Sequence, residues 1–170
     1  MSCILNIETS TSVCSVALSM DGEVLFAKAS FDGPSHAALL GVFVEEALSV
    51  LKKKGKKALD AVAVSSGPGS YTGLRIGVSV AKGLCFGFGI PLIGIHTLDI
   101  MAATVNSKGD SQIVSITDDC LYCAMLDARR MEVYAAIYDA SLKPVRETKA
   151  DIVEAGTYAS CLLYTSDAAD

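Results

Sequence analysis

The sequence has few charged residues and few histidines, and each shortage excludes a class of protein. Charged residues make up 19% of the 170 residues and apolar residues 51%, a composition too apolar for a disordered chain. The formal net charge is −5, whereas a free-standing nucleic-acid-binding protein presents a strongly basic face. His36 and His96 are the only histidines, and neither has a second histidine four residues on, so a two-histidine zinc site on a helix is excluded.

Membrane-targeting segments and a disulfide framework are also missing. Glu8 interrupts the first apolar run and no basic region precedes it, so no signal peptide is predicted. The longest uncharged stretch, 83–98, contains Pro91 and is too short to span a bilayer. The six cysteines indicate a cytoplasmic protein without disulfides. Cys120 and Cys123 form a single C-x-x-C pair, which is typical of ordinary buried thiols and leaves a zinc or redox module as a minority alternative.

Apolar runs and turn residues alternate in a way that predicts an α/β fold. Strands are expected over 3–7, 13–18, 23–29, 59–64 and 91–95, and helices over 36–51, 74–88 and 96–105. Asp21-Gly22 is a strong signal for a tight hairpin between the second and third strands. Ser35 is a good N-cap for the first helix, and Gly55 is its expected end.

A polar linker over 106–110 separates two halves that open in the same way. In each half a strand ends in an acid, Glu8 or Asp127, and a short turn leads into a second strand, over 13–18 or 132–138. This weak repeat predicts the duplicated ribonuclease-H-like fold of the actin, sugar-kinase and Hsp70 superfamily. We expect the first lobe over 1–105, the start of a truncated second lobe over 110–160, and a non-native tail over 161–170.

The expected phosphate loops of that superfamily lack the residues that hold phosphate. Each such loop has an acid for the metal ion and a glycine that lets backbone N–H groups approach phosphate. The turns after Glu8 and Asp127 contain no glycine, which disfavours ATP hydrolysis by this chain alone. The glycine-rich stretch 65–75 is not a P-loop either, because Pro68 removes a donor and Lys82 lies too deep in the following helix. We assign no catalytic residue, no metal ligand and no cofactor of its own to this chain.

The first two helices carry more apolar surface than one sheet can cover. A helix lying on a sheet needs an apolar stripe of about 100°, whereas apolar residues sweep about half the circumference of the helix over 36–51. In the next helix a ridge of small residues recurs every four positions and would let another helix approach closely. We therefore predict that both helices bind another protein. The residues assigned to this interface are Leu39, Phe43, Gly73, Leu74, Gly77, Val78 and Ala81.

Three motifs in this order resemble a known family. The stretch 67–77 reads GPGSYTGLRIG, the turn 8–10 reads ETS, and 127–134 reads DARRMEVY. Together they resemble the TsaB family, formerly YeaZ, from Ile4 to about Ala150, although Glu8 and Tyr71 stand where the family usually has aspartate and phenylalanine. The resemblance implies a bacterial non-catalytic subunit of the tRNA threonylcarbamoyltransferase complex, which modifies the adenosine beside the anticodon.

The resemblance also implies partners and a nucleotide. Family members pair with their catalytic paralogue TsaD, which holds the metal, through the first two helices; the ATPase TsaE joins them, and tRNA is reached through the complex. A homodimer is expected when TsaD is absent. ATP or threonylcarbamoyl-adenylate is handled near the shared interface. The residues expected near that nucleotide are Glu8, Thr9, Ser10, Asp127 and Arg129.

Two alternative functions would each use other residues of the chain. A small actin-like ATPase or kinase would use Glu8 and Asp127 at its phosphate loops. A redox or zinc module would use Cys120 and Cys123.

Overall fold

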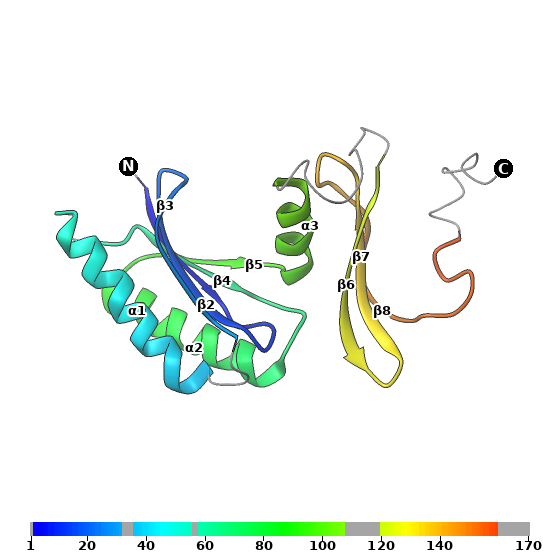
Figure 1. The fold of residues 1–170 in the computed structure, drawn as a ribbon, viewed down its shortest axis with the longest axis horizontal. Coiled ribbons are helices and arrows are strands. Elements are labelled where there is room, and N and C mark those ends of the chain that lie inside the picture. The colour runs from blue at the N-terminus through cyan, green and yellow to red at the C-terminus, as the bar shows by residue number, and fades with distance from the viewer. Residues whose placement is uncertain (1, 32–35, 56–57, 108–119, 160–170) are drawn as a thin grey trace. The chain divides into compact units, whose positions relative to one another are not determined.

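The structure, a computed structural model, describes residues 2–31, 36–55, 58–107 and 120–159 (Figure 1). Two compact units, 1–100 and 101–170, divide the chain. The division falls inside α3 (Thr97–Ser107), the helix that follows the first sheet. No helix of the described ranges is both long and apolar enough to cross a membrane.

The first unit is built on a five-stranded mixed sheet. Its strands are β1 (Cys3–Glu8), β2 (Cys14–Met20), β3 (Glu23–Ser30), β4 (Ala61–Ser65) and β5 (Leu92–Ile95), in the order β3-β2-β1-β4-β5. The first three strands pair antiparallel, whereas β4 runs parallel to β1 and β5 runs parallel to β4. This arrangement confirms the predicted ribonuclease-H-like fold.

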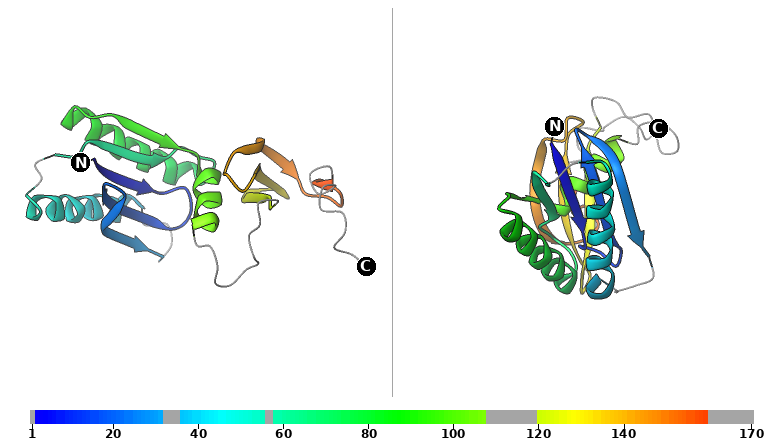
Figure 2. Two further views of the ribbon diagram at one scale, coloured as in Figure 1. Left: turned by 90° about the horizontal axis from the view of Figure 1, so that it is seen from above. Right: turned by 90° about the vertical axis from the view of Figure 1, so that its left-hand side faces the viewer.

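The helices α1 (His36–Lys53) and α2 (Tyr71–Phe88) lie side by side on one face of this sheet (Figures 1 and 2). Both predicted helices are confirmed, and α2 begins three residues earlier than expected because Ser70 caps it by accepting the Gly73 N–H. Gly89 ends α2 with a left-handed φ of 66°, as glycine does at many helix ends. The N-cap expected at residue 35 lies outside the described residues.

The core of the first unit lies between the sheet and these two helices. Alternate residues of β1 and β2 point into it, since successive side chains of a strand face opposite sides. The strand residues are Cys3, Leu5, Ile7, Cys14, Val16, Leu18, Val62 and Val64. The helix residues are Leu40, Phe43, Val44, Ala47, Leu51, Ala81 and Cys85. Each large side chain buried here contributes about 1.5–3 kcal/mol, so burial holds the inner sides of both helices to the sheet.

The second unit contains a three-stranded antiparallel sheet in the order β6-β7-β8. Its strands are β6 (Tyr122–Arg129), β7 (Glu132–Tyr138) and β8 (Pro144–Ile152). The arrangement repeats β1-β2-β3, because in both sheets the first strand pairs antiparallel with the second and the second with the third. The two halves therefore open alike, as the repeat in the sequence indicated.

Two sequence predictions around this unit need correction. The strand β8 was not predicted, because its sequence PVRETKADI has no regular apolar alternation and the strand is largely exposed at the edge of the sheet. The linker expected over 106–110 is wrong at its start, since residues 106 and 107 still belong to α3. The rest of that linker and the tail over 161–170 lie outside the described residues.

Candidate functional site

The turn after β1 is fixed between the ends of two neighbouring parallel strands. Glu8 Oε1 accepts a hydrogen bond from the Ser10 N–H at 2.6 Å. The Thr9 N–H donates to Oγ of Ser65, the last residue of β4, at 3.5 Å. Thr9 is fully buried and Ser10 is 2% exposed, so the turn belongs to the interior. In open α/β sheets the carboxyl ends of parallel strands are where ligands usually bind.

The helix α2 contacts this turn through its backbone. The Ser70 N–H donates to the carbonyl oxygen of Ser10 at 2.6 Å. A Cβ atom added at Gly73 would collide with the carbonyl oxygen of Thr9, and one added at Gly77 would collide with the Thr9 hydroxyl. The four-residue spacing of these glycines therefore places one side of α2 directly on the chain's own turn.

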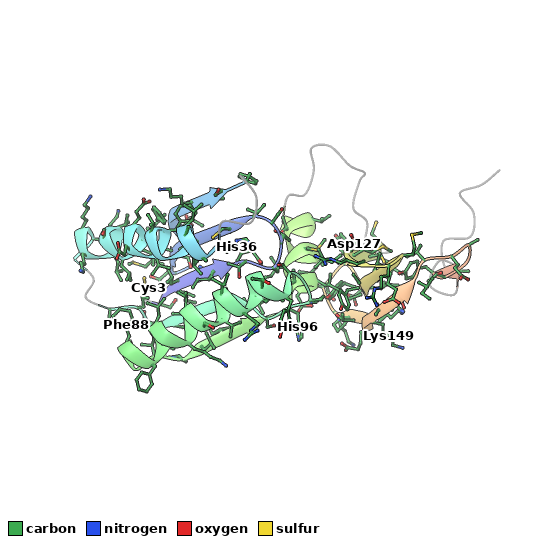
Figure 3. The ribbon with its side chains drawn as sticks, turned by 90° about the horizontal axis from the view of Figure 1, so that it is seen from below. Cys3, His36, Phe88, His96, Asp127 and Lys149 are labelled. Atoms are coloured by element: carbon green, nitrogen blue, oxygen red, sulfur yellow. The ribbon has the colours of Figure 1, made fainter. Side chains whose placement is uncertain are left out.

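His36 packs into the same junction from the first turn of α1. Its ring is 4% exposed and its Nε2 lies 2.9 Å from the carbonyl oxygen of Thr11, so Nε2 carries the proton of this bond. Figure 3 shows His36 on the side of α1 that faces α2, and Gly73 is the residue whose Cβ would meet the ring. Among the described residues, Thr9 Oγ1, Ser10 Oγ and His36 Nδ1 are buried without a hydrogen-bond partner. A buried polar group left unpaired costs about 1–3 kcal/mol, so close packing rather than complete hydrogen bonding holds this junction.

A pocket of about 360 Å³ opens beside the turn, on the sheet face opposite to α1 and α2. Its polar lining residues are Asn6, Glu8, Ser15 and Ser65, and small or branched apolar residues complete it. Among the described residues, Glu8 is the only charged one that lines it. This part of the lining presents a carboxylate, hydroxyls and an amide.

The fold implies a phosphate site at this turn, and the residues of the first unit do not fit one. The N–H groups of Thr9 and Ser10 donate inside the junction, and the Val13 N–H donates to Oγ1 of Thr11 at 3.2 Å, so these donors are occupied. The carboxylate of Glu8 could face a metal ion, but a phosphate site also relies on free backbone N–H groups, and these three are used. The turn is therefore suited to packing rather than to holding phosphate.

The glycine-rich stretch after β4 is likewise a packing turn. The Ser66 N–H donates to the carbonyl oxygen of Ile95 at 2.9 Å, and the Ser70 N–H is used by Ser10. Gly69 has a φ of 153°, and a Cβ atom there would collide with the backbone of Ser10. These contacts join β5, the start of α2 and the turn after β1.

The second predicted acid forms the same local turn in the other unit. Asp127 Oδ1 accepts the Arg129 N–H at 2.7 Å, as the carboxylate of Glu8 accepts the N–H of Ser10 two residues on. Residues 129–131 all have positive φ, between 56° and 69°. Of the residues expected near nucleotide, Glu8, Thr9 and Ser10 lie together in the first unit, and Asp127 and Arg129 lie together in the second.

Comparison with known proteins gives the family. Residues 32–159 match the family described as "TsaD: tRNA N6-adenosine threonylcarbamoyltransferase". The tRNA threonylcarbamoyladenosine biosynthesis protein TsaB of Escherichia coli is 38% identical over 139 residues, which cover 79% of this chain and 54% of that protein. TsaB of Bacillus subtilis is 30% identical, with the same two coverages. The chain belongs to the TsaB (YeaZ) family.

The solved YeaZ structures agree with this family and with the fold. YeaZ of Pseudomonas aeruginosa superposes with a TM-score of 0.71 at 29% identity, covering 88% of this chain and 66% of that one. A second P. aeruginosa structure, of a protein described as similar to the peptidase YeaZ, gives a TM-score of 0.73 at 29% identity, covering 89% and 67%. The chain spans about half the length of the curated TsaB relatives it matches.

The partner-binding residues predicted from the apolar surface of the two helices divide by burial. Those buried inside the first unit are Phe43, Gly73, Gly77 and Ala81. Those half-buried are Leu39, Leu74 and Val78. The apolar side chains that the two helices expose most are different ones: Val42 at 47%, Tyr71 at 74%, Phe86 at 92% and Phe88 at 51%. These four were not among the predicted residues, because apolarity alone does not tell which side of each helix the sheet covers.

The candidate residues of other chemistries are Cys120 and Cys123 in the second unit and His96 in the first. Cys120 is half-buried and Cys123 is exposed. Within the described ranges, no group of three histidine, cysteine, aspartate or glutamate side chains could hold a metal ion. His96 is exposed between β5 and α3.

Proposed function

We propose that this chain acts in tRNA threonylcarbamoyladenosine biosynthesis as a non-catalytic subunit that docks the catalytic subunit TsaD through α1 and α2. Membership of the TsaB family and the printed functions of its curated relatives support this role. The match to catalytic subunits also supports it: a tRNA N6-adenosine threonylcarbamoyltransferase of Nitratidesulfovibrio vulgaris is 38% identical over 112 residues. Two subunits with a shared fold can pair through equivalent helices.

The observation that carries the docking proposal is the apolar surface on the outer sides of the two helices. Their inner sides already cover the sheet, and yet Val42, Tyr71 and Phe86 are exposed on the outer sides. Phe88 is exposed at the end of α2, in line with the inner residues of that helix. Figure 3 shows Phe88 at the C-terminal end of α2. Exposed apolar residues on the outer sides of neighbouring helices are typical of a protein–protein interface. The half-buried residues Leu39, Leu74 and Val78 would border this interface.

The assignment of chemistry to other subunits rests on the turn after β1. Because the N–H groups of Thr9 and Ser10 are used internally, we propose that ATP or threonylcarbamoyl-adenylate is held by TsaD, by TsaE or at the shared interface, with no cofactor of this chain's own. The complex is proposed to be cytoplasmic and to reach tRNA through its other subunits. The buried residues Phe43, Gly73, Gly77 and Ala81 would support the docking helices from within.

Replacing Val42 by aspartate is expected to weaken binding to TsaD by about tenfold or more, or about 1.4 kcal/mol, because a charge would be placed in an apolar contact. The folded state should be unaffected, since Val42 is already 47% exposed. Calorimetric titration with TsaD measures the affinity, and thermal melting checks the fold. The matched control is Val24→Asp on β3, a 64% exposed valine away from both helices, which should bind TsaD normally. Equal affinities for the two variants would refute docking through α1.

A small actin-like ATPase is the second candidate, because Glu8 and Asp127 form the same acid-tipped turn in both units. We expect calorimetry of the isolated chain to show no binding of Mg-ATP in the micromolar range, since the donors of the Glu8 turn are occupied. Glu8→Ala should therefore leave the result unchanged. Tight binding of Mg-ATP that Glu8→Ala abolishes would favour the ATPase over the docking subunit.

A further inference from the structure

The outer side of α2 carries two cationic residues in line, with an aromatic residue at each end of the line. At 100° per residue, Tyr71, Arg75, Lys82 and Phe86 fall within an arc of about 60°. All four are exposed, Tyr71 at 74% and Phe86 at 92%. The glycines that contact the turn lie on the opposite side of the helix. We call these four residues the cationic line of α2.

The first pair of this line is already ordered in the free chain. The Arg75 guanidinium lies 5.3 Å from the centre of the Tyr71 ring, and its Nη1 is 3.4 Å from the Tyr71 hydroxyl. Stacking of this kind restricts the rotamers of a long side chain before binding. Less conformational entropy of that side chain is then lost when a partner binds. Tyr71 therefore favours one orientation of the Arg75 side chain at the start of α2.

Neither cation of the line has a carboxylate partner within the described residues. The ion pairs found there join Lys28 to Glu46 and Arg146 to Asp151. The sequence of α2 contains no acidic residue at all, although the chain as a whole has a net charge of −5. The cationic line is thus a local exception in an acidic protein, on the helix already proposed to dock a partner.

We propose that the cationic line of α2 recognises an acidic helix of the partner subunit, with carboxylates seven residues apart opposite Arg75 and Lys82 and apolar contacts for Tyr71 and Phe86. This proposal rests on the docking function above and adds the chemistry of the partner surface. Carboxylates on a helix match this spacing because residues seven apart lie on one side, two turns from each other.

A second copy of the chain, which is expected to pair with this one when TsaD is absent, offers few carboxylates to this line. Contact between two α2 helices would place cations against cations, which disfavours the pairing. The helix α1 offers Glu45 and Glu46, but Glu46 is held by Lys28 at 2.6 Å. One unpaired acid on α1 cannot oppose both Arg75 and Lys82, so the line selects a partner with more carboxylates than this chain carries on its helices.

The test is the double charge reversal Arg75→Glu with Lys82→Glu in the whole chain, titrated with the catalytic subunit at low and high salt. For the unchanged chain, we expect the affinity to fall as salt rises. The double reversal should lower the affinity by about 100-fold at low salt, mainly through slower association, because like charges would meet. The matched control, Lys143→Glu with Lys149→Glu, makes the same charge change at exposed positions of the second unit and should keep the affinity within about twofold.

A neutral pair, Arg75→Gln with Lys82→Gln, covers the case in which the reversed helix folds poorly. It should bind about tenfold more weakly than the unchanged chain and lose most of the salt dependence. Unchanged affinity in both double variants, with Val42→Asp still weakening binding, would overturn the cationic line and leave docking through α1 and α2 standing. Unchanged affinity in all three would overturn the docking function as well. A chain that dimerises alone in ultracentrifugation, and loses the dimer on neutralisation, would show that the line serves a second copy instead.

Discussion

Gly73→Ala is expected to destabilise the chain by about 3 kcal/mol, a large part of the 5–15 kcal/mol that stabilises a typical domain. The added methyl group would collide with the carbonyl oxygen of Thr9 and press against the His36 ring. A carbonyl oxygen belongs to the backbone and cannot turn aside as a flexible side chain does. The helix α2 would have to move away from the turn after β1. Urea denaturation followed by circular dichroism measures the loss.

Gly83→Ala is the matched control on the same helix. A Cβ atom at Gly83 would meet nothing within 4 Å. Because alanine has a higher helix propensity than glycine, this variant should gain up to about 1 kcal/mol. Opposite signs at two glycines of one helix would demonstrate the contact between α2 and the turn. If Gly73→Ala were as stable as the unchanged chain, that close approach would be disproved.

Phe43→Ala is expected to destabilise the chain by about 3–5 kcal/mol, because it empties a site in the core of the first unit. The Phe43 side chain is 4% exposed, and Lys28 Nζ lies 4.9 Å from the centre of its ring. Thermal and urea unfolding measure the effect. The neighbouring substitution Val42→Ala should change stability by no more than about 0.5 kcal/mol, since that side chain is half exposed.

The two variants also separate core residues from interface residues. Phe43→Ala should bind the partner normally once the unfolded fraction is taken into account, because its side chain faces the sheet. The opposite result would be a Phe43→Ala chain that is as stable as the unchanged chain but binds the partner weakly. That result would show that Phe43 belongs to the interface, as the sequence predicted.

Local signals in the sequence were sufficient for most of the first unit. Asp21-Gly22 predicted the hairpin, and both residues have positive φ, 50° and 89°, as a two-residue hairpin turn requires. A continuous apolar run located β1 and apolar alternation located β2. The start of α2 was expected three residues too late, because the cap at Ser70 was not predicted. The edge strand β8 has no such signal, since neither of its faces is buried enough to require apolar residues.

The direction of the glycine ridge was beyond a reading of the sequence. A helical wheel shows that Gly73, Gly77 and Ala81 share one side of α2, but not what covers that side. The covering residue, Thr9, lies more than sixty positions earlier and reaches the helix only when β1 and β4 pair. The same limit applies to the turn after β1. Its acid and hydroxyls predicted that it lies near a nucleotide, because the sequence shows residue types. The sequence does not show the hydrogen bonds in which the N–H groups of this turn take part.

The backbone contact between α2 and the turn has a consequence for how this protein can change during evolution. Every residue supplies the same peptide unit, so the inner side of the helix keeps its geometry as long as Gly73 and Gly77 remain. The outer positions, such as Arg75 and Lys82, do not share in that contact and can be exchanged without moving the turn. The inner side of this helix thus holds its position on the turn, while its outer side can change the partner that it binds. Substitutions at the outer positions alone could therefore be used to design a new binding specificity.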